Sequence, residues 1–148
     1  MHPKPKAAHH RLRLGRLSES GGFYLLTTVT QYRTPVFADI RAARALIRIL
    51  AHQHDSGRVD SHAFVVMPDH LHWLVQLQDD RLDALMGRVK SISSRQIGPL
   101  KWQQGFHDHA LRRETDLKKM ARYIIANPLR AGLVECVGDY PHWDAIWL

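Results

Sequence analysis

Four short stretches of the chain are rich in β-branched and aromatic residues, or alternate hydrophobic with polar residues, and therefore predict β-strands. The second and third stretches are separated only by Pro68 and Asp69, which are typical turn residues. We therefore expect these two strands to pair as a hairpin. The predicted strands cover residues 23–31, 62–67, 70–77 and 105–112.

Three other stretches have hydrophobic residues spaced three and four apart, which is the pattern of a helix with one buried side. The first follows Asp39, which can cap its start, and the second spans residues 80–97. The third follows a second capping residue, Thr115, and must stop near Asn127, because Pro128 disfavours helical geometry in the residue before it. The positions predicted to face the core are Ile40, Ala43, Ile47 and Leu50 in the first helix, Leu82, Leu85, Val89 and Ile92 in the second, and Leu117, Met120, Ala121, Ile124 and Ile125 in the third.

The order of these elements, β-α-β-β-α-β-α, matches a ferredoxin-like unit followed by one further helix. We predict an α+β fold, with a ferredoxin-like or RRM-like antiparallel sheet and helices packed on one face, which leaves the other face or one edge open for a ligand. The length of 148 residues, 45% of them hydrophobic, suits a single domain over residues 21–148. Residues 1–20 combine proline and basic residues without hydrophobic periodicity, and we expect them to form a flexible basic arm.

The chain carries an excess of positive charge, with 21 Lys and Arg residues against 14 Asp and Glu, a formal net charge of +7 and a pI near 10.0. This charge favours a polyanionic partner, nucleic acid before an acidic membrane surface. No stretch approaches the roughly 18 consecutive apolar residues of a spanning helix, and the start lacks the apolar segment of a secretory signal, so we expect a soluble, cytoplasmic protein. The basic residues that we predict to contact DNA phosphates are Arg11, Arg13, Arg16, Arg88, Lys90, Arg95, Arg112, Arg113, Lys119 and Arg122.

A pair of histidines in the third predicted strand is the first candidate for a metal site. Cys136 is the single cysteine, so a metal must be held by His, Asp, Glu, Asn or Gln instead of a thiolate cluster. Side chains two apart on a strand point to the same face, which makes His70 and His72 neighbours and turns Leu71 toward the core. A rigid strand with a hydrophobic reverse side holds two such ligands firmly.

Eleven histidines make chance pairs frequent, and a pair of solvated strand histidines is the simplest alternative for any one of them. Two other pairs with the same spacing compete. His52 and His54 lie two apart on a predicted helix and do not face each other. His107 and His109 flank an acidic residue instead of a hydrophobic anchor. We therefore place the pair in the third strand first.

The third helix supplies the second candidate, a tyrosine outside its buried stripe. Tyr123 lies at the edge of that stripe, so its phenol is not needed for the core. Asn127 is one helical turn later, and its carboxamide and the phenol can converge on one point, as a nucleophile and a metal ligand would. The alternative is a half-buried aromatic residue followed by an asparagine that caps the helix before proline.

Four segments of the chain together resemble the REP-associated tyrosine transposases, which are relatives of the single-tyrosine HUH insertion-sequence transposases. The resemblance runs in order from about residue 22 to the C-terminus, and its first and third segments are the most specific. The segments read VVMPDHLHWLVQL, WQQGFHDHALR, ARYIIANPLRAGLV and GDYPHWDAIWL.

The resemblance implies a metal-dependent nuclease that acts on single-stranded DNA. His70 and His72 fall on the HUH histidines that bind a divalent cation, Mg²⁺ or Mn²⁺, and Asn127 falls on a polar third ligand that is often Gln. Tyr123 falls on the nucleophile, which forms a 5′-phosphotyrosine and releases a 3′-hydroxyl. The implied partner is a REP-type hairpin presented as a single strand, bound by a monomer or by a homodimer.

Two other functions fit part of the pattern. A non-catalytic, RRM-like nucleic-acid-binding module would explain the element order and the charge, but it would place aromatic residues on the middle strands, where this chain has histidines. A metal-dependent phosphohydrolase would use the same two histidines with water as the nucleophile. Tyr123→Phe separates the phosphohydrolase from the tyrosine nuclease.

Overall fold

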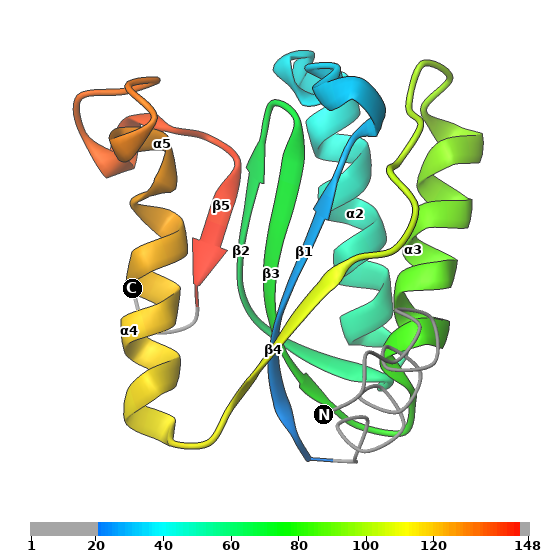
Figure 1. The fold of residues 1–148 in the computed structure, drawn as a ribbon, viewed down its shortest axis with the longest axis vertical. Coiled ribbons are helices and arrows are strands. Elements are labelled where there is room, and N and C mark those ends of the chain that lie inside the picture. Colours follow the sequence, from blue (N-terminus) through cyan, green and yellow to red (C-terminus); the bar gives the residue numbers. More distant parts are fainter. Residues whose placement is uncertain (1–20, 146–148) are drawn as a thin grey trace, which may run out of the picture.

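A five-stranded antiparallel sheet lies at the centre of the computed structural model, which describes residues 21–145 (Figure 1). The strand order is β4-β1-β3-β2-β5, so β3 lies between β1 and β2, which is the split βαβ arrangement. The predicted arm and its residues Arg11, Arg13 and Arg16 lie outside the described part of the chain. The strands are β1 Phe23–Val29, β2 Val59–Met67, β3 His70–Leu77, β4 His107–Leu111 and β5 Trp143–Ala145.

Helices lie on both sides of this sheet (Figure 1). Two of them, α2 and α3, share one face, as predicted, and α4 covers the β2–β3 part of the opposite face. The predicted α+β class is therefore confirmed. The sheet face opposite α2 and α3 is only partly open, because α4 covers the rest of it. The helices are α2 Ile40–Asp55, α3 Leu82–Gln96, α4 Glu114–Ile125 and α5 Asn127–Arg130, and short 3₁₀ turns are η1 Gln31–Arg33, η2 Val36–Ala38 and η3 Val137–Asp139.

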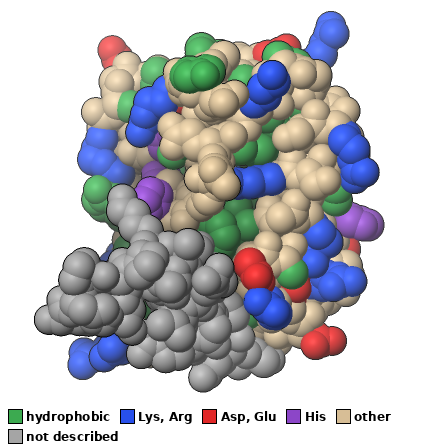
Figure 2. Space-filling model, turned by 45° about the vertical axis from the view of Figure 1, so that its right-hand side comes forward, with side chains coloured by type: hydrophobic (Ala, Val, Ile, Leu, Met, Phe, Trp, Pro, Cys, Tyr) green, Lys and Arg blue, Asp and Glu red, His purple; other side chains and the backbone are tan. Residues whose placement is uncertain are grey.

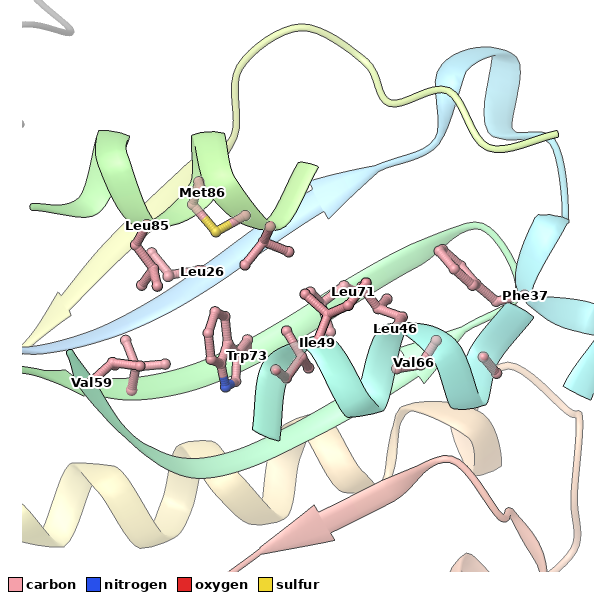
Figure 3. Close-up of a cluster of buried hydrophobic side chains, with 14 of the residues drawn as sticks. Leu26, Phe37, Leu46, Ile49, Val59, Val66, Leu71, Trp73, Leu85 and Met86 are labelled. Carbon is pink, nitrogen blue, oxygen red and sulfur yellow. The ribbon is translucent and has the colours of Figure 1, made fainter. Parts of the chain in front are cut away.

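The larger core fills the space between the sheet and the pair α2 and α3 (Figure 3). Leu71 and Trp73 point from β3 into this core, and both are fully buried. The indole Nε1 of Trp73 donates a hydrogen bond to Ser61 Oγ at 2.9 Å, so its polar atom is satisfied. Burial of such side chains contributes roughly 1.5–3 kcal/mol each. This core fixes β3 and therefore the positions of the residues on its other face.

A second core on the opposite face holds α4 against β2 and β3. Leu117, Ala121 and Ile124 are buried there, and they pack with Val65 and Leu74 of the sheet. The buried stripe of α4 is the predicted one, except that Met120 is only partly buried. Since this stripe faces the sheet, the flank of α4 beside it is left at the surface.

Of the two predicted helix caps, one is confirmed and the other is wrong. Asp39 caps α2, as expected, by accepting a hydrogen bond from the backbone N–H of Arg41 at 2.9 Å. The prediction that Thr115 caps α4 was wrong, because the helix already begins at Glu114 and Arg113 occupies the N-cap position without a capping side chain. Only two residues connect β4 to this helix, so the helix begins before the predicted cap.

The buried side of α2 is rotated relative to the predicted one. Ile40 is 47% exposed and Ile47 only partly buried, whereas Ala43 and Leu50 are buried as expected. The helix carries apolar residues on two adjoining stripes, and the sheet packs against the stripe that contains Leu46. Sequence periodicity alone does not choose between two such stripes.

A short C-terminal strand was not predicted. β5 pairs with β2 and extends the sheet at its edge. Tyr140 precedes it and donates a hydrogen bond from its hydroxyl to the carbonyl of Val66 at 2.6 Å, which fastens the C-terminal segment to the sheet. The helices within residues 21–145 include none with the length and apolar character needed to cross a bilayer.

Candidate active site

The two histidines of the predicted metal site lie side by side at the start of β3. Their ring centroids are 4.8 Å apart, and the rings are nearly perpendicular, at 82°. Both project from the face that carries α4, while Leu71 between them is buried on the other side. The prediction that His70 and His72 share one face, opposite Leu71, is confirmed.

Each histidine has its Nδ1 atom engaged by a neighbouring side chain. Asp69 Oδ1 lies 2.7 Å from Nδ1 of His70, and Thr27 Oγ1 lies 2.8 Å from Nδ1 of His72. Since an ionised carboxylate only accepts hydrogen bonds, His70 donates from Nδ1 and the lone pair of the ring is on Nε2. Partners of this kind fix the tautomer and the ring orientation of metal-binding histidines. In both rings Nδ1 is engaged, so Nε2 is the nitrogen that a metal could reach.

Asn127 reaches this pair from the first turn of α5. Its Nδ2 atom lies 3.3 Å from Nε2 of His70, although the two residues are 57 positions apart in the sequence. The nitrogen and oxygen of an amide are nearly identical in shape, so rotation of the amide would turn its oxygen to the same place. Among the described residues, no group of three His, Cys, Asp or Glu side chains could hold a metal ion. A cation at this site would therefore rest on His70, His72 and Asn127.

Burial and hydrogen bonding set the charges of the site. Burial lowers the pKa of His72 to about 4, with smaller contributions from His70 and Arg130. Burial alone would raise the pKa of Asp69, but hydrogen bonds from His70 and Arg33 outweigh it and hold that pKa below its ordinary value. His72 is thus neutral and Asp69 ionised at neutral pH. This is the protonation state in which a histidine binds a metal and a carboxylate orients another.

Tyr123 lies on the exposed flank of α4, with 61% of its surface accessible. The guanidinium of Arg130 stacks on its ring, with the Cζ atom 3.9 Å from the ring centroid. Nη2 of Arg130 also donates to Oδ1 of Asn127 at 3.4 Å. One guanidinium thus links the phenol to the residue beside His70. Tyr123 and Asn127 thus share a contact with Arg130, which the sequence analysis did not single out, and the convergence of the phenol hydroxyl and the carboxamide on one point stays a prediction.

An open cavity of about 700 Å³ lies between β4 and α4, next to this tyrosine. Three of the predicted DNA contacts, Arg112, Arg113 and Lys119, line the cavity and give it a basic rim. The other lining residues are His109, Ala110, Leu111, Asp116, Met120 and Tyr123. An extended, negatively charged strand could enter the site along this side of the helix.

Other predicted DNA contacts lie elsewhere. Arg88 contacts Asp80 and donates to Gln53 Oε1 at 3.1 Å, between α2 and α3. Lys90 donates to the carbonyl oxygens of Gln103, at 2.9 Å, and Gly105, and burial lowers its pKa. Both residues therefore hold parts of the domain together. Arg95 and Arg122 are exposed, and Lys and Arg side chains occupy several separate places on the face in Figure 2.

The two competing histidine pairs have different surroundings from those of His70 and His72. His54 accepts a hydrogen bond from the backbone N–H of Ser61 at 3.0 Å. His107 and His109 are exposed on the edge strand β4. His107 is in register with Thr27, which is itself in register with His72, so it occupies the same face two strands away.

The comparisons with known proteins agree with this geometry. The family model described as "Transposase IS200 like" matches residues 20–127. A Haemophilus influenzae protein described as a REP-associated tyrosine transposase is 30% identical over 142 residues, which cover 82% of this chain and 78% of the relative. The chain belongs to the REP-associated tyrosine transposases of the IS200-like family. An Escherichia coli REP-associated tyrosine transposase is 34% identical over 84 residues, 54% of this chain and 50% of that protein.

A solved structure shows the same fold in this family. A REP-associated tyrosine transposase bound to a REP hairpin superimposes with a TM-score of 0.72 and 23% sequence identity, over 97% of this chain and 82% of that one. The resemblance derived from the four sequence segments is therefore confirmed at the level of family and of fold. His70 and His72 lie on a strand and Tyr123 on a helix, as the sequence analysis predicted.

Proposed function

We propose that this transposase cuts and rejoins single-stranded hairpin DNA of the REP type through a covalent 5′-phosphotyrosine at Tyr123. The observation that carries the proposal is the 3.3 Å contact between Asn127 and His70. This contact brings the end of α4 to the face of β3 that carries both histidines. Tyr123 lies one helical turn before Asn127, near that end of α4. This contact supports the proposal, because it places the candidate metal ligands His70 and Asn127 together and the candidate nucleophile on the helix that leads to Asn127.

The chemistry is a transesterification. The Oη atom of Tyr123 attacks the phosphorus, and the bond between phosphorus and the 3′-oxygen breaks. The phenol loses its proton and the departing oxygen gains one, which leaves a free 3′-hydroxyl and a 5′-phosphate joined to the tyrosine. A divalent cation, Mg²⁺ or Mn²⁺, held by His70, His72 and Asn127 would neutralise the non-bridging phosphate oxygens. Because the phosphotyrosine keeps an activated bond, a 3′-hydroxyl can reverse the reaction and rejoin the strand.

Arg130 is suited to assist the attack on the phosphate. Its guanidinium lies against the ring of Tyr123, so its charge stays beside the nucleophile. A phosphate attacked by that phenol would lie within reach of the same guanidinium. Donors that are already oriented toward developing charge contribute strongly to catalysis, because they need not reorganise during the reaction.

The same features support a proposal for the substrate and one for the assembly. The basic cavity between β4 and α4 suits an unpaired strand, and the relative of known structure was solved with a REP hairpin. We propose that the hairpin places its single-stranded foot in this cavity.

Tyr123, Arg130 and Asn127 are connected within one chain, which favours a monomer as the active unit over a homodimer that exchanges helices.

The test uses REP-type hairpin oligonucleotides from the gene's own flanks, labelled at the 3′ end. Wild type is incubated with Mn²⁺, Mg²⁺ or EDTA, and the products are separated on a denaturing gel before and after protease digestion. We expect a slowly migrating, protease-sensitive adduct with either metal and no product in EDTA. His70→Ala, His72→Ala and Asn127→Ala should lose the adduct but keep hairpin binding. Hairpin binding by wild type without any cutting would assign the protein to the non-catalytic binding modules.

A further inference from the structure

The turn η1, which follows β1, holds two consecutive residues in a conformation that non-glycine residues rarely adopt. The φ angles of Tyr32 and Arg33 are +58° and +52°. Both lie in the left-handed region, where the Cβ atom crowds the backbone and raises the free energy. Strain of this kind persists only where surrounding contacts enforce it, and it concentrates at functional sites.

Hydrogen bonds to two other segments enforce this turn. The backbone N–H of Thr30 donates to the carbonyl of Asp69 at 2.9 Å, and that of Gln31 donates to the carbonyl of Lys101 at 2.8 Å. The hydroxyl of Thr30 also donates to the carbonyl of Thr34 at 2.8 Å, across the turn. The turn is therefore fixed between the β2–β3 hairpin and the segment before β4.

The fixed turn directs an aromatic side chain outward. Tyr32 is 89% exposed, more than Tyr123 at 61%, so the strain of its backbone is not offset by burial of the ring. A cavity of about 230 Å³ adjoins the ring and is lined by Gln31, Tyr32, Thr34, Pro99 and Lys101. An exposed aromatic ring beside a lysine is the combination that binds single-stranded nucleic acid, in which a base stacks on the ring and the cation meets a phosphate.

The same turn contacts the candidate active site. Nη1 of Arg33 lies 3.1 Å from Oδ2 of Asp69, whose other carboxylate oxygen accepts the hydrogen bond of His70. Tyr32 is thus one residue away from a chain of contacts that ends at a metal-binding histidine. This turn therefore contacts the residue that orients His70, which puts it at one border of the site that a DNA strand with a phosphate at His70 and His72 would occupy.

We propose that Tyr32 is a stacking platform for an unpaired nucleobase close to the scissile phosphate, with Lys101 as the adjoining phosphate contact. The inference rests on the proposed function, because it assumes a single strand in the active site. Stacking tolerates any base, since every base has a π-face, so the platform positions the strand without reading its sequence. The fixed turn keeps this side chain on the outside of the domain before the DNA arrives.

The test compares three substitutions at this position in the Tyr123→Phe background, so that the DNA stays uncut. Tyr32→Phe and Tyr32→Trp keep an aromatic face, whereas Tyr32→Asn removes it and places a residue that tolerates the left-handed region. Affinity is measured by fluorescence anisotropy with a hairpin that has an unpaired foot and with a fully paired duplex. A second set of hairpins carries 2-aminopurine at each unpaired position in turn, because its fluorescence is quenched by stacking.

We expect Tyr32→Asn to weaken hairpin binding by about 5- to 100-fold, the range for loss of one stacked base, and to leave duplex binding unchanged. Tyr32→Phe and Tyr32→Trp should bind like the parent, and quenching at one unpaired position should disappear only in Tyr32→Asn. The melting temperature of Tyr32→Asn should equal or exceed that of the parent, because the strain is relieved. Equal hairpin affinity of Tyr32→Asn and its parent would overturn the platform alone, whereas a parent that binds no hairpin would overturn the proposed function as well.

Discussion

Asp69 Oδ1 lies 2.7 Å from Nδ1 of His70, so the residue at the turn of the β2–β3 hairpin orients the first histidine of the strand that follows it. The carboxylate is itself held by Arg33. Thr27 makes the equivalent contact with His72 from the neighbouring strand. Both rings are therefore held in position, and the carboxylate, which only accepts, also fixes the tautomer of His70 with the lone pair on Nε2.

Removal of the carboxylate next to His70 should weaken metal binding. We expect Asp69→Asn to lower Mn²⁺ affinity by about 10- to 100-fold, the usual effect of losing a partner that orients a ligating histidine. Isothermal titration calorimetry measures this directly. Asp55→Asn, which changes an exposed carboxylate at the end of α2, is the matched control and should bind Mn²⁺ like wild type. Equal affinities of all three proteins would show that Asp69 does not orient the site.

The low pKa of His72 makes the metal-free protein less stable in acid. The unfolded chain takes up a proton near pH 6.5, whereas folded His72 does so only near pH 4, so stability falls as the pH falls between these values. From pH 7.5 to pH 5.0, in EDTA, wild type should lose about 2 kcal/mol more than His72→Gln. Urea unfolding at the two pH values checks this. The same loss in both proteins would mean that other groups cause it.

The residue between the two histidines should matter for folding and not for chemistry. Leu71 is fully buried under α2 and α3, so Leu71→Ala should lower the free energy of unfolding by about 2–5 kcal/mol through lost burial and a cavity. His70→Ala removes a partly exposed side chain on the other face and should cost far less stability. Denaturant unfolding compares the two variants. A larger loss for His70→Ala would contradict the assignment of the two faces.

Arg130 should act on the reaction more than on binding. Since its guanidinium touches both Tyr123 and Asn127, Arg130→Gln should slow adduct formation by about 100-fold, the usual cost of losing one preorganised donor. Hairpin affinity should change little, because the cavity still presents Arg112, Arg113 and Lys119. Arg130→Lys keeps the charge without the planar stacking and should be intermediate. Single-turnover cleavage and anisotropy separate the two effects, and a loss confined to affinity would make Arg130 a DNA contact only.

Much of the site could be predicted because it depends on short-range periodicity. Alternation along β3 places His70 and His72 on one face, and helical spacing leaves Tyr123 outside the buried stripe of α4. Both relations hold within a single element, where the backbone geometry is regular. The strand order and the family also agreed with expectation, because a split βαβ unit has few alternatives once its elements are in order.

The features that could not be predicted depend on contacts between distant segments. Arg130 follows α4 in a four-residue helix, and only the fold shows that it turns back onto Tyr123. β5 has three residues and forms because β2 offers a free edge. The left-handed turn at Tyr32 contains no glycine, so its sequence carries no sign of the strain that the neighbouring segments impose.

The most direct test of the central claim is cleavage of a REP-type hairpin, labelled at the 3′ end in one sample and at the 5′ end in another, by wild type and by Tyr123→Phe, with Mn²⁺ and with EDTA. The proposal predicts a protein-linked 5′ end and a free 3′-hydroxyl fragment for wild type with metal. Tyr123→Phe should bind the hairpin with the same affinity and produce neither product. Metal-dependent cutting that survives Tyr123→Phe would contradict the proposal, because water would then be the nucleophile at His70 and His72.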